Sequence, residues 1–154
     1  MLASRLVEMI EKHADELTRE VVRELETSLR TPSYHKLEGR DVYGRVVEVL
    51  RHMGEWLDYK SDATTETWYK ALGHSRCQEG VPLSELVYAL MLTKQSLRGF
   101  IRSQGLVDSA MELYQQLELY SLINRFFDRA IYFAVTGYEE EADLRWKPAG
   151  TIAG

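Results

Sequence analysis

The stretch HSRCQEGVPLSEL, residues 74–86, separates two amphipathic patterns and marks where one predicted helix ends and the next begins. Gly80 can adopt the left-handed backbone conformation that ends many helices. Pro82 has a fixed φ that suits the first turn of a helix. Ser84 and Glu85 place a polar and an acidic residue in that turn, where the helix dipole favours negative charge. The stretch therefore predicts a sharp corner between two helices.

Apolar side chains recur at spacings of three and four residues on both sides of this corner, which is the period of one helix face. Residues 2–30 fit either one long helix or two abutting helices. Pro32 ends this segment because proline has no amide hydrogen to donate. No run shows the two-residue alternation of a strand. The chain is therefore predicted to be all-α with about five helices, at residues 2–30, 41–58, 64–80, 83–105 and 108–138.

The length and composition fit one globular domain. The 154 residues are 45% hydrophobic and 28% charged, with only three prolines. We expect residues 1–140 to form a single helical sensor or signalling domain. Three adjacent glutamates at 139–141 oppose the dipole at the expected end of the last helix, and residues 147–154 have no apolar period. Residues 141–154 are therefore predicted to be a linker or a flexible C-terminal tail.

Charge and hydropathy exclude several classes of partner. With a net charge of −5, the chain has no basic field to attract nucleic acid or anionic lipid. Its longest uncharged runs, residues 86–93 and 130–138, are shorter than the roughly 20 apolar residues that span a bilayer. Charged residues come too early at the N-terminus for a secretion signal, and a single cysteine cannot form an internal disulfide. We expect a cytoplasmic protein that binds neither nucleic acid nor membrane.

His74 and Cys77 are three residues apart on a predicted helix and could supply half of a zinc site. The other half is missing, because there is no second cysteine and His13, His35 and His52 lie on separate segments. Cys77 lies in the last turn of its helix, where the dipole disfavours a thiolate nucleophile. Phosphate-binding glycine loops and serine-nucleophile motifs are absent from the sequence. We therefore expect no metal site and no enzymatic activity.

The predicted helix at 108–138 is apolar around more of its circumference than one core contact requires. It contains a polar amide, Asn124, for which we favour a hydrogen-bonded interior residue over a ligand contact. Phe126, Tyr132 and Phe133 lie off the main stripe. They fit a central helix packed on several sides, an aromatic-lined cavity or a dimer face. The main stripe comprises Leu113, Leu117, Tyr120, Asn124, Phe127, Ile131, Ala134 and Tyr138.

Two segments, RCQEGVPLSELVYALMLTKQSLRGFI (76–101) and INRFFDRAIYFAVTGYE (123–139), resemble the N-terminal helical domain of RsbRD-type regulators, the stressosome-related co-antagonists of RsbT. The resemblance spans roughly residues 5–140. It implies a domain that senses or relays a signal without catalysis, usually as a dimer beside an output module. No kinase or STAS segment follows residue 140, so the output is expected in a partner protein or in a longer chain. The resemblance is carried by Arg76, Gly80, Pro82, Leu83, Ser84, Glu85, Phe127, Asp128, Arg129 and Tyr138.

The string ALGHSRCQEGV (71–81), followed by an amphipathic helix and a long last helix, is similar to the corner of globins that holds the haem-ligating histidine. In that alignment Arg76 occupies the ligand position and His74 lies two residues early. Two residues rotate a side chain by about 200° around a helix, so His74 is expected to point away from such a pocket. This resemblance implies a globin-like fold or a related antiparallel helical bundle without bound haem. Residues proposed to line a pocket are His52, His74, Arg76 and Asn124.

These observations favour a non-catalytic bacterial signalling domain without a cofactor. We expect it to form a homodimer through the helix around 108–138 and to relay a signal to a separate partner protein. The alternative is a globin-like sensor that binds haem or another small ligand.

Overall fold

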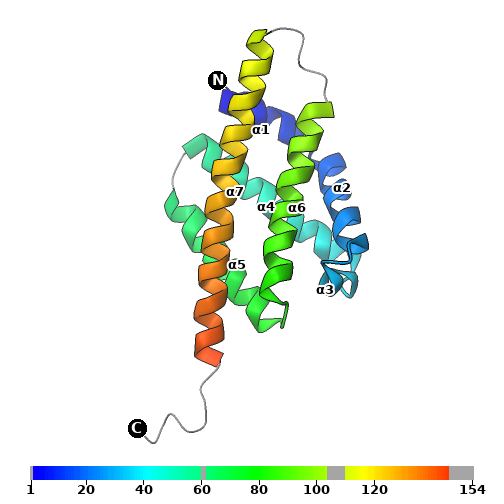
Figure 1. Cartoon of the computed structure of the whole chain (residues 1–154), viewed down its shortest axis with the longest axis vertical. Helices are drawn as coiled ribbons and strands as arrows, with labels where there is room; N and C mark the ends of the chain where they lie inside the picture. The colour runs from blue at the N-terminus through cyan, green and yellow to red at the C-terminus, as the bar shows by residue number, and fades with distance from the viewer. Residues whose placement is uncertain (1, 60–61, 104–109, 146–154) are drawn as a thin grey trace, which may run out of the picture.

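The computed structural model describes residues 2–59, 62–103 and 110–145, and these residues form seven helices and no strand (Figure 1). The all-α prediction is therefore confirmed. The helices are α1 (Leu2–Lys12), α2 (Ala14–Thr27), α3 (Pro32–His35), α4 (Gly39–Tyr59), α5 (Asp62–Gln78), α6 (Leu83–Ser103) and α7 (Ala110–Arg145). Residues 104–109 and 146–154, which include the expected turn before the last helix and most of the expected tail, lie outside the described residues.

Two features raise the helix count above the five that were expected. Residues 2–30 contain two abutting helices, because His13 takes a φ of −115° and a ψ of 18° and leaves the helical conformation between α1 and α2. The segment after Thr31, expected to be a loop, begins with the one-turn helix α3. Pro32 stands in its first turn, where the missing amide hydrogen is not needed.

The helices α5 and α7 pack closely and run parallel to each other. Asp62 at the start of α5 accepts a hydrogen bond from Arg129 of α7. Near the end of α5, the carbonyl oxygen of Cys77 accepts a hydrogen bond from Arg145, at the end of α7. Their backbones approach so closely that a Cβ atom added at Gly73 would overlap the carbonyl of Ala134. A Cβ atom added at Gly137 would overlap the backbone of Lys70. The close contact is thus possible because Gly73 of α5 and Gly137 of α7 have no side chain.

The remaining helices complete the bundle around this pair (Figure 1). Helix α6 runs antiparallel to α7. Arg98 stacks over the Tyr120 ring near one end of the pair, and at the other end the Tyr138 hydroxyl donates to the carbonyl of Val81. Helices α1 and α2 pack on α4, and α2 also contacts α6. Within the described residues, none of the helices combines the length and apolarity that a membrane crossing requires.

The buried face of α7 is rotated from the stripe that the sequence predicts. Leu113 and Leu117, expected in that stripe, are exposed. Phe126, expected off it, is completely buried, and its ring lies 5.7 Å from that of Trp56 and 5.8 Å from that of Tyr69. The rotation arises because α7 packs against α5 and α6 together, so its buried arc faces the groove between them. This arc comprises Gln116, Leu119, Ile123, Phe126, Phe127, Ala130, Ala134 and Gly137.

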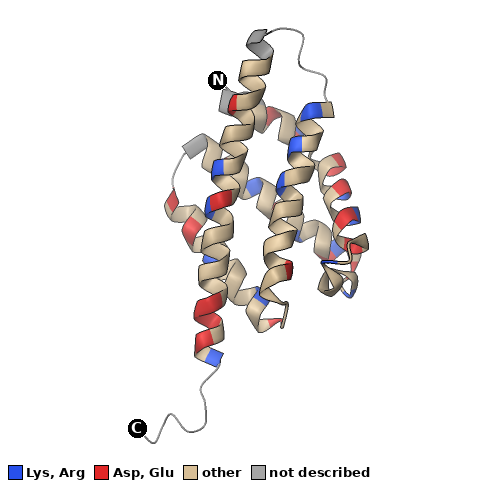
Figure 2. Ribbon diagram, in the orientation of Figure 1, with Lys and Arg blue, Asp and Glu red and all other residues tan. Residues whose placement is uncertain are grey.

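Helix α7 also continues beyond the point where a tail was expected to start. It extends through residues 141–145 to Arg145, whose guanidinium donates to the carbonyl of Cys77 at 3.0 Å. The three glutamates at 139–141 do not end the helix, because side chains of α5 pair with two of them. Figure 2 shows these acidic residues over the last turns of α7.

Candidate functional site

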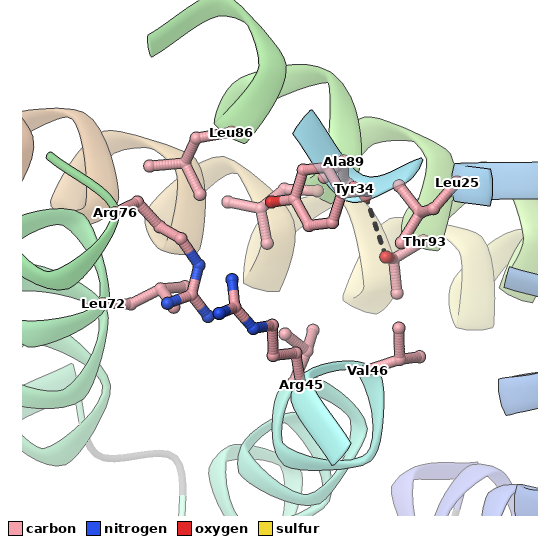
Figure 3. Close-up of a pocket in the computed structure, with 11 residues that line it drawn as sticks. Leu25, Tyr34, Arg45, Val46, Leu72, Arg76, Leu86, Ala89 and Thr93 are labelled. Atoms are coloured by element: carbon pink, nitrogen blue, oxygen red, sulfur yellow. Dashed lines mark hydrogen bonds between the residues drawn. The ribbon is translucent and has the colours of Figure 1, made fainter. Parts of the chain in front are cut away.

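A small pocket lies where α3, α4, α5 and α6 meet. Its volume is about 30 Å³, which is enough for one water molecule. Most of its wall is aliphatic, and its polar groups come from Tyr34, Arg45, Arg76 and Thr93. The Thr93 hydroxyl is already bonded to the carbonyl of Ala89 at 2.9 Å. Figure 3 shows the guanidinium groups of Arg45 and Arg76 facing each other across this pocket.

The corner at the end of α5 positions Arg76. The Val81 amide donates to the Arg76 carbonyl and the Gly80 amide donates to the Cys77 carbonyl, both at 3.0 Å. Gly80 has a φ of +78°. This pair of bonds around a left-handed glycine is the Schellman motif, which the sequence predicts at this position. The motif fixes the last turn of α5, so that Arg76 points into the bundle and its side chain is only 9% exposed.

Two cations in this pocket share one carboxylate. Arg45 forks onto Glu79 through two bonds of 3.0 and 3.1 Å, and Arg76 reaches the same carboxylate at 3.3 Å. Burial lowers the pKa of Arg76 from its ordinary value, and the neighbouring charge of Arg45 lowers it further. Burial raises the pKa of the Tyr34 hydroxyl, and the positive charges of Arg76 and Arg45 oppose that rise. We call Arg45, Arg76 and Glu79 the arginine triad.

His74 faces the opposite side of α5 from Arg76, as the two-residue spacing predicts. Its Nδ1 lies 3.1 Å from Glu141 and its Nε2 lies 3.2 Å from Glu140. Both ring nitrogens of His74 therefore face carboxylates of α7. The hydrogen bond to His74 is the largest of the effects that lower the pKa of Glu141. His74 therefore fastens the last turns of α7 to α5.

The other residues proposed to line a pocket lie apart from the triad. His52 is buried on α4, where its ring lies 4.1 Å from that of Trp68. Burial lowers its pKa, and Glu55 opposes the shift. Asn124 is partly buried, but its Oδ1 atom has no hydrogen-bond partner among the described residues, contrary to the expected satisfied amide. The structure therefore brings only Arg76, of the four proposed residues, into this pocket.

Sequence reasoning missed Arg45 and Tyr34, which line this pocket, and Glu79, which pairs with its arginines. Arg45 lies four residues before Val49, so helical periodicity puts it beside the apolar face of α4, and this signal could have found it. Glu79 stands next to the predicted corner without any pattern of its own. Tyr34 lies in a segment that was expected to be a loop, so no periodicity marked it.

A second cavity, of about 320 Å³, is lined by residues of α1, α2 and α4. Its wall includes Ile10, Leu50 and Gly54, and Glu11 and Arg51 also line it. Thr18 contributes a fully buried hydroxyl that has no hydrogen-bond partner among the described residues. A volume near 300 Å³ is at the lower end of the range of small-molecule sites.

Side chains that could bind a metal ion are not clustered in the described part of the molecule. Among the residues that the structure describes, no cluster of three or more His, Cys, Asp and Glu side chains could hold a metal ion. Cys77 is a free, partly buried thiol.

Comparison with known proteins assigns the chain to a family. A family model described as the RsbT co-antagonist protein rsbRD N-terminal domain matches residues 15–147. Neither the curated proteins nor the solved structures gave a match to the chain. The matched range contains the arginine triad, the close pair of α5 and α7, and the contacts of His74. Because the model covers most of the sequence, the chain belongs to the family of RsbRD N-terminal domains of RsbT co-antagonist proteins.

Proposed function

We propose that this protein is a non-catalytic signalling domain of the stress response that forms a homodimer through α7 and relays a signal to a partner protein in the cytoplasm. Membership of the RsbRD N-terminal family supports a role in stress signalling. The observation that carries the dimer is a set of large apolar side chains left exposed on α7. They are Leu113 (49% exposed), Tyr114 (62%), Leu117 (56%) and Tyr132 (68%).

The spacing of these residues supports a contact face on one side of α7, in which the exposed polar residues Ser121, Arg125 and Asp128 separate Leu117 from Tyr132. Tyr114 and Tyr132 are eighteen residues apart, which is about five whole turns, so they lie on the same side of the helix. Leu117 lies three residues after Tyr114 and widens the same side. A two-fold dimer uses one patch on both subunits, and a long straight helix can align with its symmetry mate along such a face. We call this side of α7 the dimer face.

The close contact between α5 and α7 supports a route for the signal. Gly73 and Gly137 bring the two backbones together, and His74 and Arg145 tie their ends. A movement of α5 would therefore carry α7 with it, and packed helices tend to shift between discrete positions. Because α7 has 36 residues, and a helix rises 1.5 Å per residue, it is about 54 Å long. A shift of the C-terminal turns of α7, which are tied to α5, would therefore be carried along the helix to the dimer face.

Light scattering of a charged variant tests this proposal. Leu117→Glu places a carboxylate in the dimer face, where burial without a partner is costly. The wild type should have the mass of a dimer at high micromolar concentration, and Leu117→Glu should have the mass of a monomer. Leu29→Glu is the matched control, because Leu29 is 94% exposed and lies outside the helices. A monomeric wild type would refute the dimer.

A small-ligand sensor is the second candidate, and the 320 Å³ cavity with the unpartnered Thr18 hydroxyl favours it. None of the cavities described above is lined by a histidine, whereas haem is most often held by one. We therefore propose an organic ligand with a hydrogen-bonding group rather than haem for this alternative. Native mass spectrometry of the purified protein would detect a retained ligand, and an absorption spectrum after addition of haem would test the haem version.

A further inference from the structure

The arginine triad has an excess of positive charge in a mostly apolar setting. Two guanidinium groups meet one carboxylate, and no other carboxylate among the described residues forms an ion pair with either of them. The Arg76 side chain is about nine-tenths buried, and a buried cation is costly unless it is paired and hydrogen-bonded. One further negative charge would balance the triad, or a better ligand could take the place of Glu79.

The Glu79 side chain is free to rotate away from the two arginines. It follows the last residue of α5, and its side chain is 39% exposed. Its backbone amide bonds Ser75 and does not depend on the carboxylate. Rotation of the side chain toward solvent would therefore free both guanidinium groups without unwinding the corner. Glu79 thus supplies, from the chain itself, a carboxylate to a site in which two guanidinium groups bind a carboxylate.

The surroundings of the two arginines indicate what the site would accept. A guanidinium fork matches the two oxygens of a carboxylate, as the paired bonds between Arg45 and Glu79 illustrate. Behind the guanidinium groups the wall is aliphatic, with Leu72, Leu86 and Ala89 around the small empty volume. That space is mostly apolar and only about 30 Å³ in volume, so it suits a methyl-sized hydrocarbon end better than further charged oxygens.

We propose that this pocket binds a small aliphatic monocarboxylate, whose carboxylate displaces Glu79 from Arg45 and Arg76 and whose hydrocarbon part enters the space beside Leu86. The triad would then be a ligand site that Glu79 closes when the ligand is absent. Binding is a simple exchange of one carboxylate for another, so the charge of the pocket is unchanged. The proposal goes beyond the signalling role and does not depend on the dimer.

A titration with propionate tests the proposal. The arginine side-chain N–H signals are followed by nuclear magnetic resonance, with sodium chloride exchanged for sodium propionate at constant ionic strength so that salt screening stays fixed. Glu79→Gln removes the tethered competitor, so propionate should bind this variant at least about tenfold more tightly than the wild type, since a tethered group acts at high effective concentration. Saturable shifts should occur at Arg45 and Arg76.

Two further variants in the Glu79→Gln background identify the site. Arg45→Gln should abolish saturable propionate binding, and Arg45→Lys should weaken it because the fork is lost while the charge remains. Arg51→Gln is the matched control. It removes an arginine of the same helix that pairs with Glu48 and Glu55 outside the pocket, so binding should be unchanged. Circular dichroism checks that each variant is folded.

The other outcomes overturn the proposal. A folded Glu79→Gln protein that shows no saturable shift with propionate would mean that the triad is purely structural. Inorganic phosphate binding as tightly as propionate would refute an aliphatic carboxylate and indicate a general anion site. Light scattering on the same samples keeps this result separate from the dimer, because loss of propionate binding with an intact dimer contradicts only the pocket.

Discussion

At the scale of single residues, the arginine triad stabilises the fold because the Glu79 carboxylate compensates the buried positive charge of Arg76. Glu79→Ala leaves Arg76 buried beside Arg45 with no carboxylate. Since Glu79 is partly exposed and solvent screens it, we expect the free energy of unfolding to fall by about 1 kcal/mol. Urea denaturation measures this loss. Glu38→Ala breaks an exposed pair with Arg40 at the surface and should cost less. An equal loss in both variants would contradict a special role for the triad.

His74 gives a second prediction at this scale. Its hydrogen bond is the largest cause of the lowered pKa of Glu141, whose ordinary value is 4.5. A carboxyl group with a lowered pKa stabilises the folded state above that ordinary value, and the contribution is lost as the pH falls through the lowered value. His74→Ala should therefore be less stable than the wild type near pH 5.5, and the difference should shrink toward about pH 3.

Denaturation at several pH values measures that difference, and His35→Ala serves as the control because His35 is exposed on α3. A gap between His74→Ala and the wild type that stays constant across this range would show that the pairing with Glu141 adds nothing.

Residues were predictable from the sequence where their signal was local. Gly80 and Pro82 predict the corner between α5 and α6 because their backbone preferences do not depend on the rest of the molecule. The opposite directions of His74 and Arg76 follow from their spacing on one helix. The partners of Arg76 were not predictable, because Arg45 and Glu79 meet only when α4 and α5 are packed together.

At the scale of helices, the contact between α5 and α7 depends on glycine. Gly73→Ala would place a methyl group against the Ala134 carbonyl, and neither backbone can move without disturbing the bundle. We expect a loss of about 3 kcal/mol or more in the free energy of unfolding. Gly44→Ala is the control, because a Cβ atom there meets nothing within 4 Å. That substitution should stabilise α4 by up to about 1 kcal/mol. Similar effects of the two changes would contradict the close packing.

The sequence predicted the helices better than their faces. Apolar periodicity located five helical segments, and it left the split at His13 open as one of two alternatives. It missed α3 because four residues are too few to show a period. It misjudged the inner face of α7, where Leu113 lies outside and Phe126 lies inside, since that face is decided by two neighbouring helices rather than by α7 itself.

At the scale of the whole molecule, the proposed dimer through α7 would link stability to protein concentration. Association stabilises the folded state by mass action, so the melting temperature of the wild type should rise with concentration. The same scan of Leu117→Glu should be flat, because the charged dimer face cannot pair. Differential scanning calorimetry over a hundredfold range of concentration makes the comparison. A flat response of the wild type would argue against association.

We propose that this RsbRD N-terminal domain is a dimer built on α7, and the native mass of the purified protein decides between a dimer and a single chain. One chain has a mass of 17.8 kDa. Native mass spectrometry should show a main species of twice that mass, which Leu117→Glu converts to a single chain, and any retained ligand would appear as an added mass. A wild-type spectrum dominated by the single chain at high micromolar concentration would contradict the proposed dimer.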